Sequence, residues 1–335
     1  RIGASTRCGA AAARASFSML STLIWVAGTL FLAKELVSFL YVFYKGLLRA
    51  PKDLTKYGKW AVVTGATDGI GKAISFELAR RGCSVVLVSR TQSKLDAVAA
   101  ELKEAYPKVD VKTEAVDFGN LTKDRLSELE KSLGGLEVGV LFNNVGVSYD
   151  FSQWFHELLD SEVEALLKLN VESTTWMTKL VLPGMVNRRA GAIVNQSSAA
   201  ARFPLPLLAG YSAAKGYIEN LTRSCHGEYE AKGIHFQCQS PLWVATPMVF
   251  PNSKVPPEKR ATLMVPTPKK YARSAVAAIG QDTLISPYWV HEIAIWFGNR
   301  LPEFLVVQGI LKMHLAVRFN KKCVAKMEEK QKKAQ

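Results

Sequence analysis

Ser198, Tyr211 and Lys215 are the residues whose types and spacing best fit proton transfer at a carbonyl group. A tyrosine phenol titrates near ~10 in water, so its pKa must be tuned before it transfers protons well at neutral pH. Lys215 follows Tyr211 by four residues and lies on the same helix face, where its charge favours the phenolate. Ser198 supplies a hydroxyl that can hold the substrate oxygen. Alone, this pattern is weak, because ordinary exposed helix pairs also show it.

A glycine-rich turn upstream strengthens this interpretation. The apolar run Trp60–Thr64 is typical of a strand, and Lys72–Arg81 has helical periodicity. Between them, Gly65 permits a tight turn, Gly69 permits close approach of a pyrophosphate, and Gly71 permits close packing of helix on strand. Phosphate charge would lie at the helix N-terminus. A tight turn without a ligand is the alternative. The other turn residues expected in this cofactor site are Thr67, Asp68 and Ile70.

The end of the next strand indicates which dinucleotide is preferred. The run Ser84–Val88 leads into Ser89 and Arg90, at the place where an acidic residue would bind the ribose 2′-hydroxyl of NAD. A small hydroxyl and a guanidinium suit a 2′-phosphate, so we expect NADPH/NADP as the cofactor. The alternative is that Arg90 only begins the next helix in solvent. Asp117, after a strand-like run, is expected to accept a hydrogen bond from the adenine amino group.

Strand-like and helix-like segments alternate six times along the chain, which predicts an α/β protein with a Rossmann-type, doubly wound parallel sheet. The apolar run Val138–Phe142 opens into the polar turn Asn143–Gly146, where Asn144 is expected to contact the cofactor. Asn170 lies in a helical stretch from about 161 to 188, either as a satisfied core residue or as part of a site. No metal-ligand spacing occurs among the cysteines, so we expect no metal.

Together these residues resemble the short-chain dehydrogenase/reductase superfamily over roughly residues 59–247. As a set the motifs are highly specific. They are the Thr64–Gly71 turn, Asn143–Gly146, Asn170, Ser198, Tyr211, Lys215 and Pro241–Thr246. The resemblance implies that Val244 and Thr246 also line the cofactor site, together with Tyr211 and Lys215.

The resemblance also assigns roles in carbonyl reduction. Tyr211 would donate a proton to the nascent alkoxide as hydride arrives from the nicotinamide. Lys215 would lower the pKa of Tyr211 and hold the nicotinamide ribose, Ser198 would hydrogen-bond the carbonyl oxygen, and Asn170 would position a water in the proton relay. Ser198 is preferred to its neighbour because its spacing to Tyr211 matches the family. Gln196 departs from the small or apolar residue common in the family, which leaves its packing open.

Finer features resemble one branch, the membrane-bound very-long-chain 3-oxoacyl-CoA reductases, also called 17β-hydroxysteroid dehydrogenase type 12. They are Val145, Tyr149, Leu182–Met185 and Val244–Thr246. The branch implies NADPH-dependent reduction of a long-chain 3-oxoacyl-CoA to the 3-hydroxyacyl-CoA in microsomal fatty-acid elongation, with elongase, dehydratase and enoyl reductase as partners. A hydroxysteroid or retinoid oxidoreductase is the first alternative. A silent NADPH-binding scaffold is the second, and the intact catalytic residues argue against it.

An apolar segment near the N-terminus predicts a membrane anchor. Residues 17–33 carry no charge, and the apolar run resumes after Lys34 and Glu35, so we expect one transmembrane helix at about 17–44. A cleavable signal peptide is the alternative, but no Ala-x-Ala site follows the run. Basic residues are more numerous after the segment than before it, and the positive-inside rule then places the catalytic domain in the cytosol.

Both ends of the chain bear on its location. The chain begins without methionine, and Met19 is a candidate start; a mitochondrial presequence is another interpretation of the basic first residues. Near the other end, Lys332 and Lys333 resemble the dilysine retrieval signal of endoplasmic-reticulum membrane proteins, with a basic frayed tail as the alternative. Anchor and signal together predict the endoplasmic reticulum membrane, with the catalytic domain facing the cytosol.

The 335 residues and the net charge of +14 fit one catalytic domain with appendages. We expect an N-terminal extension and anchor at 1–56, an NADP-binding catalytic domain at 57–288, and an amphipathic, basic C-terminal extension at 289–335. Trp289, Ile293, Trp296 and Phe297 recur there at helical spacing, for a helix that either lies in a membrane interface or packs on the protein.

The charge and the cysteines bear on partners and environment. The excess of Lys and Arg suits CoA phosphates and anionic lipid headgroups, and nothing in the sequence points to nucleic acid. The five cysteines are scattered and odd in number, which favours reduced thiols over a disulfide framework. A homodimer through the helices that carry Asn170 and Tyr211 is usual in the superfamily.

Overall fold

The computed structural model describes residues 2–250, 253–319, 324–325 and 327, with side chains from residue 17 onward. The chain divides into two compact units, residues 1–49 and 50–335. The first unit is the helix α1, Ile2–Phe43, followed by a π-helical turn at Tyr44–Leu48. The helix expected at about 17–44 therefore lies within a longer, uninterrupted one. Lys332 and Lys333 of the predicted retrieval signal lie outside the described residues.

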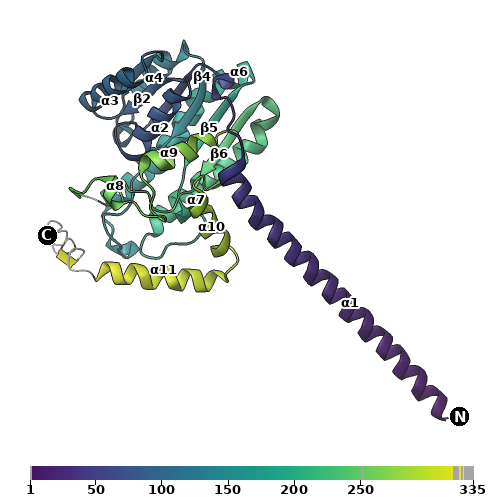
Figure 1. Ribbon diagram of the computed structural model, residues 1–335. Coiled ribbons are helices and arrows are strands. Elements are labelled where there is room, and N and C mark those ends of the chain that lie inside the picture. Colours follow the sequence, from purple (N-terminus) through teal and green to yellow (C-terminus); the bar gives the residue numbers. More distant parts are fainter. Residues whose placement is uncertain (1, 251–252, 320–323, 326, 328–335) are drawn as a thin grey trace. The chain divides into compact units, whose positions relative to one another are not determined.

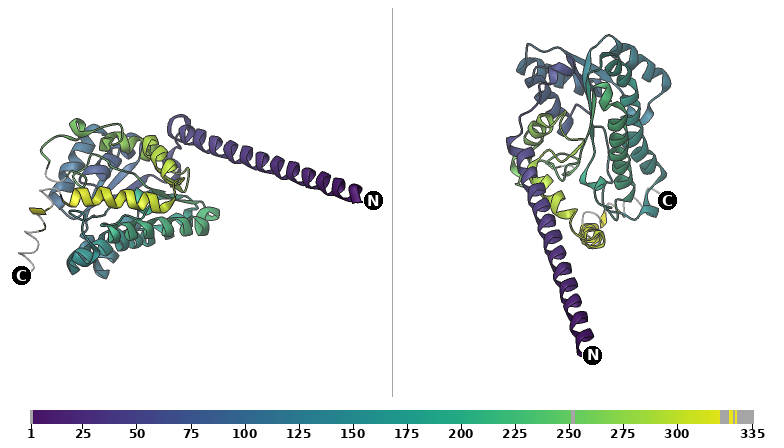
Figure 2. Two further views of the ribbon diagram at one scale, coloured as in Figure 1. Left: turned by 90° about the horizontal axis from the view of Figure 1, so that it is seen from below. Right: turned by 90° about the vertical axis from the view of Figure 1, so that its right-hand side faces the viewer.

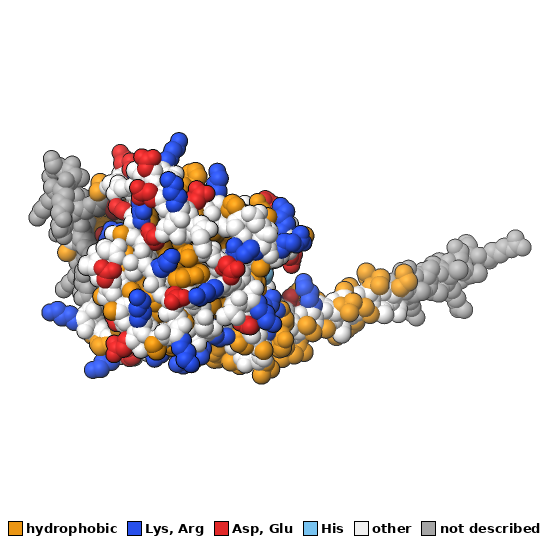
Figure 3. Space-filling view, turned by 90° about the horizontal axis from the view of Figure 1, so that it is seen from above, with side chains coloured by type: hydrophobic (Ala, Val, Ile, Leu, Met, Phe, Trp, Pro, Cys, Tyr) orange, Lys and Arg blue, Asp and Glu red, His pale blue; other side chains and the backbone are white. Residues whose placement is uncertain are grey.

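The first unit contains a candidate membrane span. Phe17–Leu48 is a segment of 32 residues with mean hydropathy 1.7, and none of its apolar 18-residue window is buried. Hydrophobic side chains cover the described part of this helix (Figure 3). The segment exceeds the roughly 20 apolar residues that a bilayer requires. Its length and composition therefore permit a membrane span, as they would also permit a signal sequence.

The second unit is built on a seven-stranded sheet in the order β3-β2-β1-β4-β5-β6-β7 (Figure 1). Every neighbouring pair is parallel, which confirms the predicted doubly wound fold. The strand order reverses between β1 and β4, and this reversal opens a crevice at the carboxyl ends of the strands. The strands are β1 Trp60–Thr64, β2 Ser84–Ser89, β3 Val111–Ala115, β4 Val138–Asn143, β5 Gly191–Gln196, β6 Ile234–Gln239 and β7 Leu284–Ile285.

Helices cover both faces of this sheet (Figure 2). In β1, Ala61 and Val63 pack in one core with α2, α3 and α9, while Trp60 and Val62 pack in the other with α4 and α6. The strands read as continuous apolar runs because both of their faces are buried. The helices of this unit are α2 Gly69–Arg80, α3 Gln92–Ala105, α4 Lys123–Gly134, α5 Asp160–Leu166, α6 Ser173–Arg188, α7 Ala209–Tyr229, α8 Pro257–Arg260, α9 Pro268–Ala277, α10 Trp289–Gly298 and α11 Glu303–Arg318.

The two outermost strands differ from the buried ones between them. The edge strand β3 carries Lys112 and Glu114, and none of its residues is fully buried. At the other edge, β7 consists of Leu284 and Ile285 alone. The sheet therefore ends on one charged strand and one very short strand.

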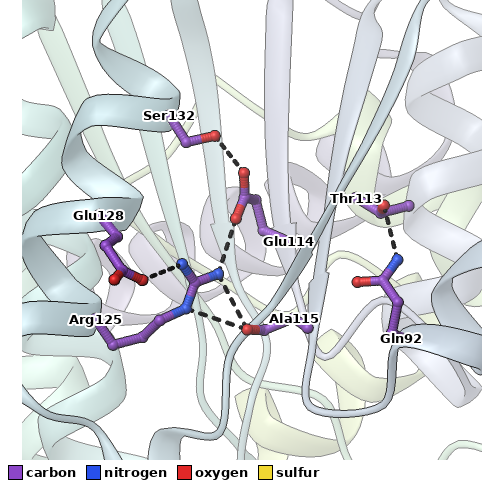
Figure 4. A network of polar contacts seen from close by, with 7 residues as sticks. All are labelled: Gln92, Thr113, Glu114, Ala115, Arg125, Glu128 and Ser132. Carbon is purple, nitrogen blue, oxygen red and sulfur yellow. Dashed lines mark hydrogen bonds and ion pairs between the residues drawn. The ribbon is translucent and has the colours of Figure 1, made fainter.

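A polar network ties α4 to β3 (Figure 4). Arg125 donates to Glu114 Oε2 at 2.9 Å and to the Ala115 carbonyl oxygen at 3.1 Å. Ser132 donates to the other oxygen of Glu114, and Arg125 also pairs with Glu128 at 3.1 Å. The network fixes the last residues of β3, from which the chain runs directly into the predicted cofactor site.

In α10, the predicted stripe is not the most buried face. Its fully buried residues are Val290, His291 and Ile295. Three members of the stripe Trp289, Ile293, Trp296 and Phe297 are half-buried, and Phe297 is exposed. The helix packs on the catalytic unit partly through His291, whose Nε2 lies 2.8 Å from the Met264 carbonyl oxygen.

Candidate active site

A cavity of about 510 Å³ lies at the carboxyl edge of the sheet, beside the N-terminus of α2. It joins residues that follow β1, β2, β3 and β4, as the doubly wound topology requires. Nine predicted cofactor residues line it: Gly65, Asp68, Gly69, Ile70, Ser89, Arg90, Asp117, Asn144 and Thr246. Sequence reasoning had not placed Val116, Phe118 or Leu169 in this cavity, because isolated apolar residues carry no local signal of a ligand.

The glycine turn has the geometry that a dinucleotide needs. Gly65 and Gly69 have φ angles of +65° and +55°, a region that favours glycine. A Cβ atom on Gly71 would lie 2.2 Å from the Gly65 carbonyl oxygen, so only glycine allows this approach of α2 to the turn. Asp68 caps α2, its Oδ1 accepting from Gly69 N at 2.6 Å. The remaining N–H groups of the first turn can therefore bind phosphate.

Asn144 links the end of β4 to the start of the glycine turn through hydrogen bonds. Its Nδ2 donates to the Thr64 carbonyl oxygen at 3.1 Å, and Thr64 Oγ1 accepts from Asn144 N at 2.9 Å and Val145 N at 3.2 Å. The amide thus holds β1 and β4 at a fixed separation in the crevice. This gives the asparagine turn a structural role beside the predicted contact with the cofactor.

The residues expected to select the dinucleotide meet at one end of the cavity. Thr67 Oγ1 and Ser89 Oγ lie 3.0 Å apart, and Arg90 is exposed at the cavity wall. Asp117 also lines the wall, but both of its carboxylate oxygens have partners in the chain. One accepts from Gly119 N at 3.0 Å and the other from Asn120 Nδ2 at 2.8 Å. Asp117 therefore shapes its own loop, with or without a contact to adenine.

A second cavity, of about 420 Å³, adjoins the first. Both are lined by Ile70, Asn144, Gly146 and Thr246, so they lie side by side. The second cavity contains the predicted catalytic side chains and the Val244 segment, and one of its walls comes from α11. Its catalytic and cofactor residues are Ser198, Tyr211, Lys215 and Val244. A cofactor lying in the first cavity would thus reach the candidate catalytic residues.

The structure brings Ser198, Tyr211 and Lys215 together. Helix α7 carries both Tyr211 and Lys215, and Lys215 Nζ lies 5.7 Å from the centroid of the Tyr211 ring. Ser198, after β5, lies beside the Tyr211 hydroxyl and acts to lower its pKa. The neighbouring Ser197 instead donates to the Lys215 carbonyl oxygen at 3.0 Å and is buried. This geometry favours Ser198 as the serine that faces a substrate.

The ionisation of the site departs from the expectation drawn from Lys215. Burial raises the pKa of Tyr211, against the opposing effect of Ser198. Burial also lowers the pKa of Lys215 to about 8. The pKa of Tyr211 thus shifts in the direction opposite to the one expected, because the cost of burying a phenolate dominates. At neutral pH the side chain is therefore a phenol, which is the protonated form that carbonyl reduction needs.

Asn170 lies on a π-helical segment, Leu167–Glu172, between α5 and α6. Its Nδ2 donates to the carbonyl oxygens of Val147 and Leu166 at 2.9 and 3.0 Å, and its Oδ1 accepts from Val147 N at 3.2 Å. The amide therefore holds the loop after β4, beside the cavity. A Cβ atom on Gly146 would lie 2.6 Å from Asn170 Oδ1 and 3.1 Å from Lys215 Nζ, so these two side chains converge on one point.

Gln196, whose packing the sequence left open, belongs to the support of Lys215. Its Nε2 lies 3.2 Å from Tyr271 Oη and 3.3 Å from the Gln239 carbonyl oxygen. Its backbone carbonyl accepts from Lys215 Nζ at 3.2 Å. Tyr271 is fully buried, so the glutamine amide provides a partner for a hydroxyl that would otherwise lack one.

Comparisons with known proteins agree with this geometry. A very-long-chain 3-oxoacyl-CoA reductase-like protein of Arabidopsis thaliana is 42% identical over 83% of this chain and 89% of its own. The very-long-chain 3-oxoacyl-CoA reductase of Macaca fascicularis is 41% identical over 78% and 81%. A human relative, inactive hydroxysteroid dehydrogenase-like protein 1, is 40% identical over 77% of each chain. Overall identity therefore does not by itself separate active from inactive relatives.

Solved structures share the fold. A 7β-hydroxysteroid dehydrogenase, 22% identical, matches 77% of this chain and 99% of its own with a TM-score of 0.69. A short-chain dehydrogenase from Sphingobium yanoikuyae, solved with NADPH, is 26% identical over 76% and 95%, with a TM-score of 0.61. The profile of the short chain dehydrogenases matches residues 59–255, close to the extent expected from the motifs. The chain therefore belongs to the short-chain dehydrogenase family.

Proposed function

We propose that this protein is an NADPH-dependent reductase that converts very-long-chain 3-oxoacyl-CoA to 3-hydroxyacyl-CoA. The observation that carries the proposal is identity near 41% over most of the chain to reductases of that name. The candidate catalytic residues support it, because Ser198, Tyr211 and Lys215 meet in one cavity. That arrangement argues against a non-catalytic NADPH-binding scaffold. The scaffold remains an alternative to test, because one human relative is named an inactive hydroxysteroid dehydrogenase-like protein.

The residues of the first cavity fit NADPH. Close approach of α2 at Gly71 brings free N–H groups to the place of the pyrophosphate. Ser89 and Arg90 would bind the 2′-phosphate, the guanidinium with charge-assisted hydrogen bonds. Gly146 leaves the junction of the two cavities open, where any side chain would meet Asn170 and Lys215. Bound there, NADPH supplies the hydride for reduction.

Side chains of the protein would donate the proton to the substrate and replace it afterwards. Tyr211 is a phenol at neutral pH and is therefore ready to donate to the oxygen of the reduced carbonyl. Ser198 would hydrogen-bond that oxygen and hold it near the phenol. Lys215, held by the Gln196 carbonyl oxygen, would bind the nicotinamide ribose. Asn170 would keep the loop after β4 in place and position the water that returns a proton.

The membrane setting belongs to the same proposal. We infer that α1 anchors the protein through Phe17–Leu48, so that the catalytic unit works beside a bilayer from which acyl chains are drawn. The endoplasmic reticulum, with the catalytic unit in the cytosol, is the expected location. Fluorescence protease protection of the full chain in cells would test this topology. Elongase, dehydratase and enoyl reductase are the expected partners.

The decisive assay follows oxidation of NADPH by the purified full chain. The substrates are 3-oxoacyl-CoAs of several chain lengths, with estrone in a parallel reaction. We expect turnover of the 3-oxoacyl-CoAs, and activity on estrone alone would overturn the assignment. The Tyr211→Phe variant is the control. It should bind NADPH normally and lose 10²- to 10⁴-fold in kcat, as removal of a general acid typically does.

A further inference from the structure

Helix α11 packs on the catalytic unit through partly buried apolar residues, such as Val307 and Leu311, and through two buried polar ones. His314 and Arg318 are only 8% and 6% exposed, although one is ionisable and the other is charged. On the same helix and just after it, Phe304 and Phe319 are 65% and 71% exposed. A surface helix in water keeps a mainly polar outer face, whereas on α11 the outer face combines Gln308 and Lys312 with large exposed apolar residues. The distribution of side chains on α11 therefore needs an explanation other than packing in water.

The inward contacts are specific. His314 Nδ1 lies 2.6 Å from the Pro206 carbonyl oxygen. The two terminal nitrogens of Arg318 donate to the two carboxylate oxygens of Glu157 at 2.8 and 2.7 Å, and one of them also donates to the Ser152 carbonyl oxygen at 3.2 Å. A bidentate pair of this kind fixes orientation as well as position. These bonds hold α11 in one rotation about its axis, with Phe304, Leu305, Met313 and Val317 exposed.

Exposed apolar residues lie at both ends of the helix, with the exposed Gln308 and Gly309 between them. Phe304, Leu305, Met313 and Val317 on α11 are all among the exposed large hydrophobic residues, as is Phe319. Lys312 is exposed between them, and its long apolar stem can lie along such a surface while its ammonium reaches headgroups. The opposite side of the unit, seen in Figure 3, has acidic and basic side chains interspersed in the ordinary manner of a hydrated surface. In Figure 1, α11 forms the lower border of the unit.

This outward surface also borders the substrate cavity. Ile310, Met313 and His314 line the cavity that contains Tyr211, and Met313 is at the same time exposed on the outside. The cavity wall and the apolar surface are therefore two sides of one helix. Pro206, which His314 holds, belongs to the loop between Phe203 and Leu208, two further lining residues.

We propose that the apolar face of α11, formed by Phe304, Leu305, Met313, Val317 and Phe319, docks on the surface of a lipid bilayer. Three observations select a bilayer as the occupant. The same chain carries a 32-residue candidate span, which would keep this unit beside a membrane. The net charge of +14 complements anionic headgroups. The helix has the length and apolar face of an interfacial helix rather than of a spanning one.

Docking would give lipid-borne chains a short path to the catalytic residues. Because Met313 borders both the outer surface and the cavity, an acyl chain leaving the bilayer beside α11 would meet the cavity directly. This consequence rests on the proposed function. The docking itself does not, because the exposure of the apolar residues on α11 is independent of the substrate.

The test uses the full chain, reconstituted in vesicles of phosphatidylcholine and phosphatidylserine that contain an alkyne-tagged phosphatidylcholine. The photocross-linking amino acid p-benzoylphenylalanine replaces Phe304 or Phe319 in two separate variants. A matched control replaces Tyr217, an exposed aromatic residue on α7. All three positions are exposed, although the Tyr217 hydroxyl lies 2.9 Å from Thr175 Oγ1, and NADPH binding reports that each variant is folded.

We expect tagged lipid to be attached at both α11 positions, at a level several-fold above that at Tyr217. Lipid adducts no more frequent than at Tyr217 would overturn the proposal. Adducts to a second copy of the chain, or to another protein, in place of lipid would also overturn it, because the face would then be a protein interface. The readout needs no turnover, so a failure of the reductase assay would leave this result unaffected.

Discussion

Replacement of Gly71 by alanine tests the cofactor site at its tightest point. The new Cβ atom would lie 2.2 Å from the Gly65 carbonyl oxygen and 2.6 Å from Asn144 Nδ2. Ordinary contact begins at 3.4 Å, so α2 and the turn must separate by about 1.2 Å. The carbonyl belongs to the main chain and cannot swing away as a flexible side chain would. The strain must therefore displace the N-terminus of α2, which is the predicted binding site of the pyrophosphate.

The expected losses of stability and of NADPH affinity in Gly71→Ala have separate causes. Overpacking of this kind costs about 1–3 kcal/mol of unfolding free energy, and we expect the upper end because the obstacle is backbone. Displacement of the α2 N-terminus weakens phosphate hydrogen bonds, each worth about 1.5–3 kcal/mol to a charged group. Loss of one such bond raises the Kd of NADPH at least about tenfold.

The matched control is Gly227→Ala, in the exposed part of α7, where a Cβ atom meets nothing within 4 Å. Alanine is favoured over glycine in helices, so this variant should gain up to about 1 kcal/mol. The Kd of NADPH is measured by titration of its fluorescence, and stability by the midpoint of thermal unfolding in the same detergent. If Gly71→Ala binds NADPH as tightly as Gly227→Ala, the pyrophosphate does not lie at the N-terminus of α2.

Four further outcomes are expected. Ser198→Ala should lower kcat without changing NADPH binding, as steady-state kinetics would show. Ser197→Ala should instead lower the unfolding free energy by about 1 kcal/mol, because it loses a buried hydrogen bond, and thermal unfolding measures this loss. Arg90→Ala should raise the KM for NADPH about tenfold or more and leave that for NADH nearly unchanged; an equal effect on both would rule out recognition of the 2′-phosphate. Lys215 has a pKa of about 8 in the folded protein, below its ordinary 10.5, so the unfolding free energy of the wild type relative to Lys215→Met should rise with pH across that interval. Burial acts to raise the pKa of Glu157, but the hydrogen bonds from Arg318 outweigh it and lower this pKa. The stability that the pair contributes is therefore present above pH ~4.3 and is lost as pH falls through the folded-state pKa of Glu157. Hydrogen exchange of α11 should accelerate at that acidic pH in the wild type and should be fast at all pH values in Glu157→Gln.

The geometry of the glycine turn and the proximity of the candidate catalytic residues were predictable because their signals are local. Gly65, Gly69 and Gly71 lie within one strand–turn–helix passage, and Tyr211 and Lys215 lie one helical turn apart. In such cases residue type and spacing determine geometry with little help from the rest of the chain. The parallel sheet was predictable for a similar reason, because alternating apolar strands and helices have few other ways to pack.

The features that could not be predicted depend on contacts between residues that are distant in the sequence. The packing of Gln196 could not be predicted because its partner Tyr271 lies 75 residues away. The orientation of α11 depends on contacts of His314 and Arg318 with residues 108 and 161 positions distant. The upward shift of the Tyr211 pKa depends on how deeply the folded chain buries it, which the four-residue spacing to Lys215 does not reveal.

The two borders of the sheet have a consequence for solubility. An unpaired strand can recruit the strand of another molecule, and long apolar borders are where aggregation starts. Here one border carries Lys112 and Glu114, and the other offers only Leu284 and Ile285. Covering charged side chains with an incoming strand is costly at the first, and the second is too short to template one. Crowded copies of this protein should therefore resist fibrous association even where its neighbours are closely packed.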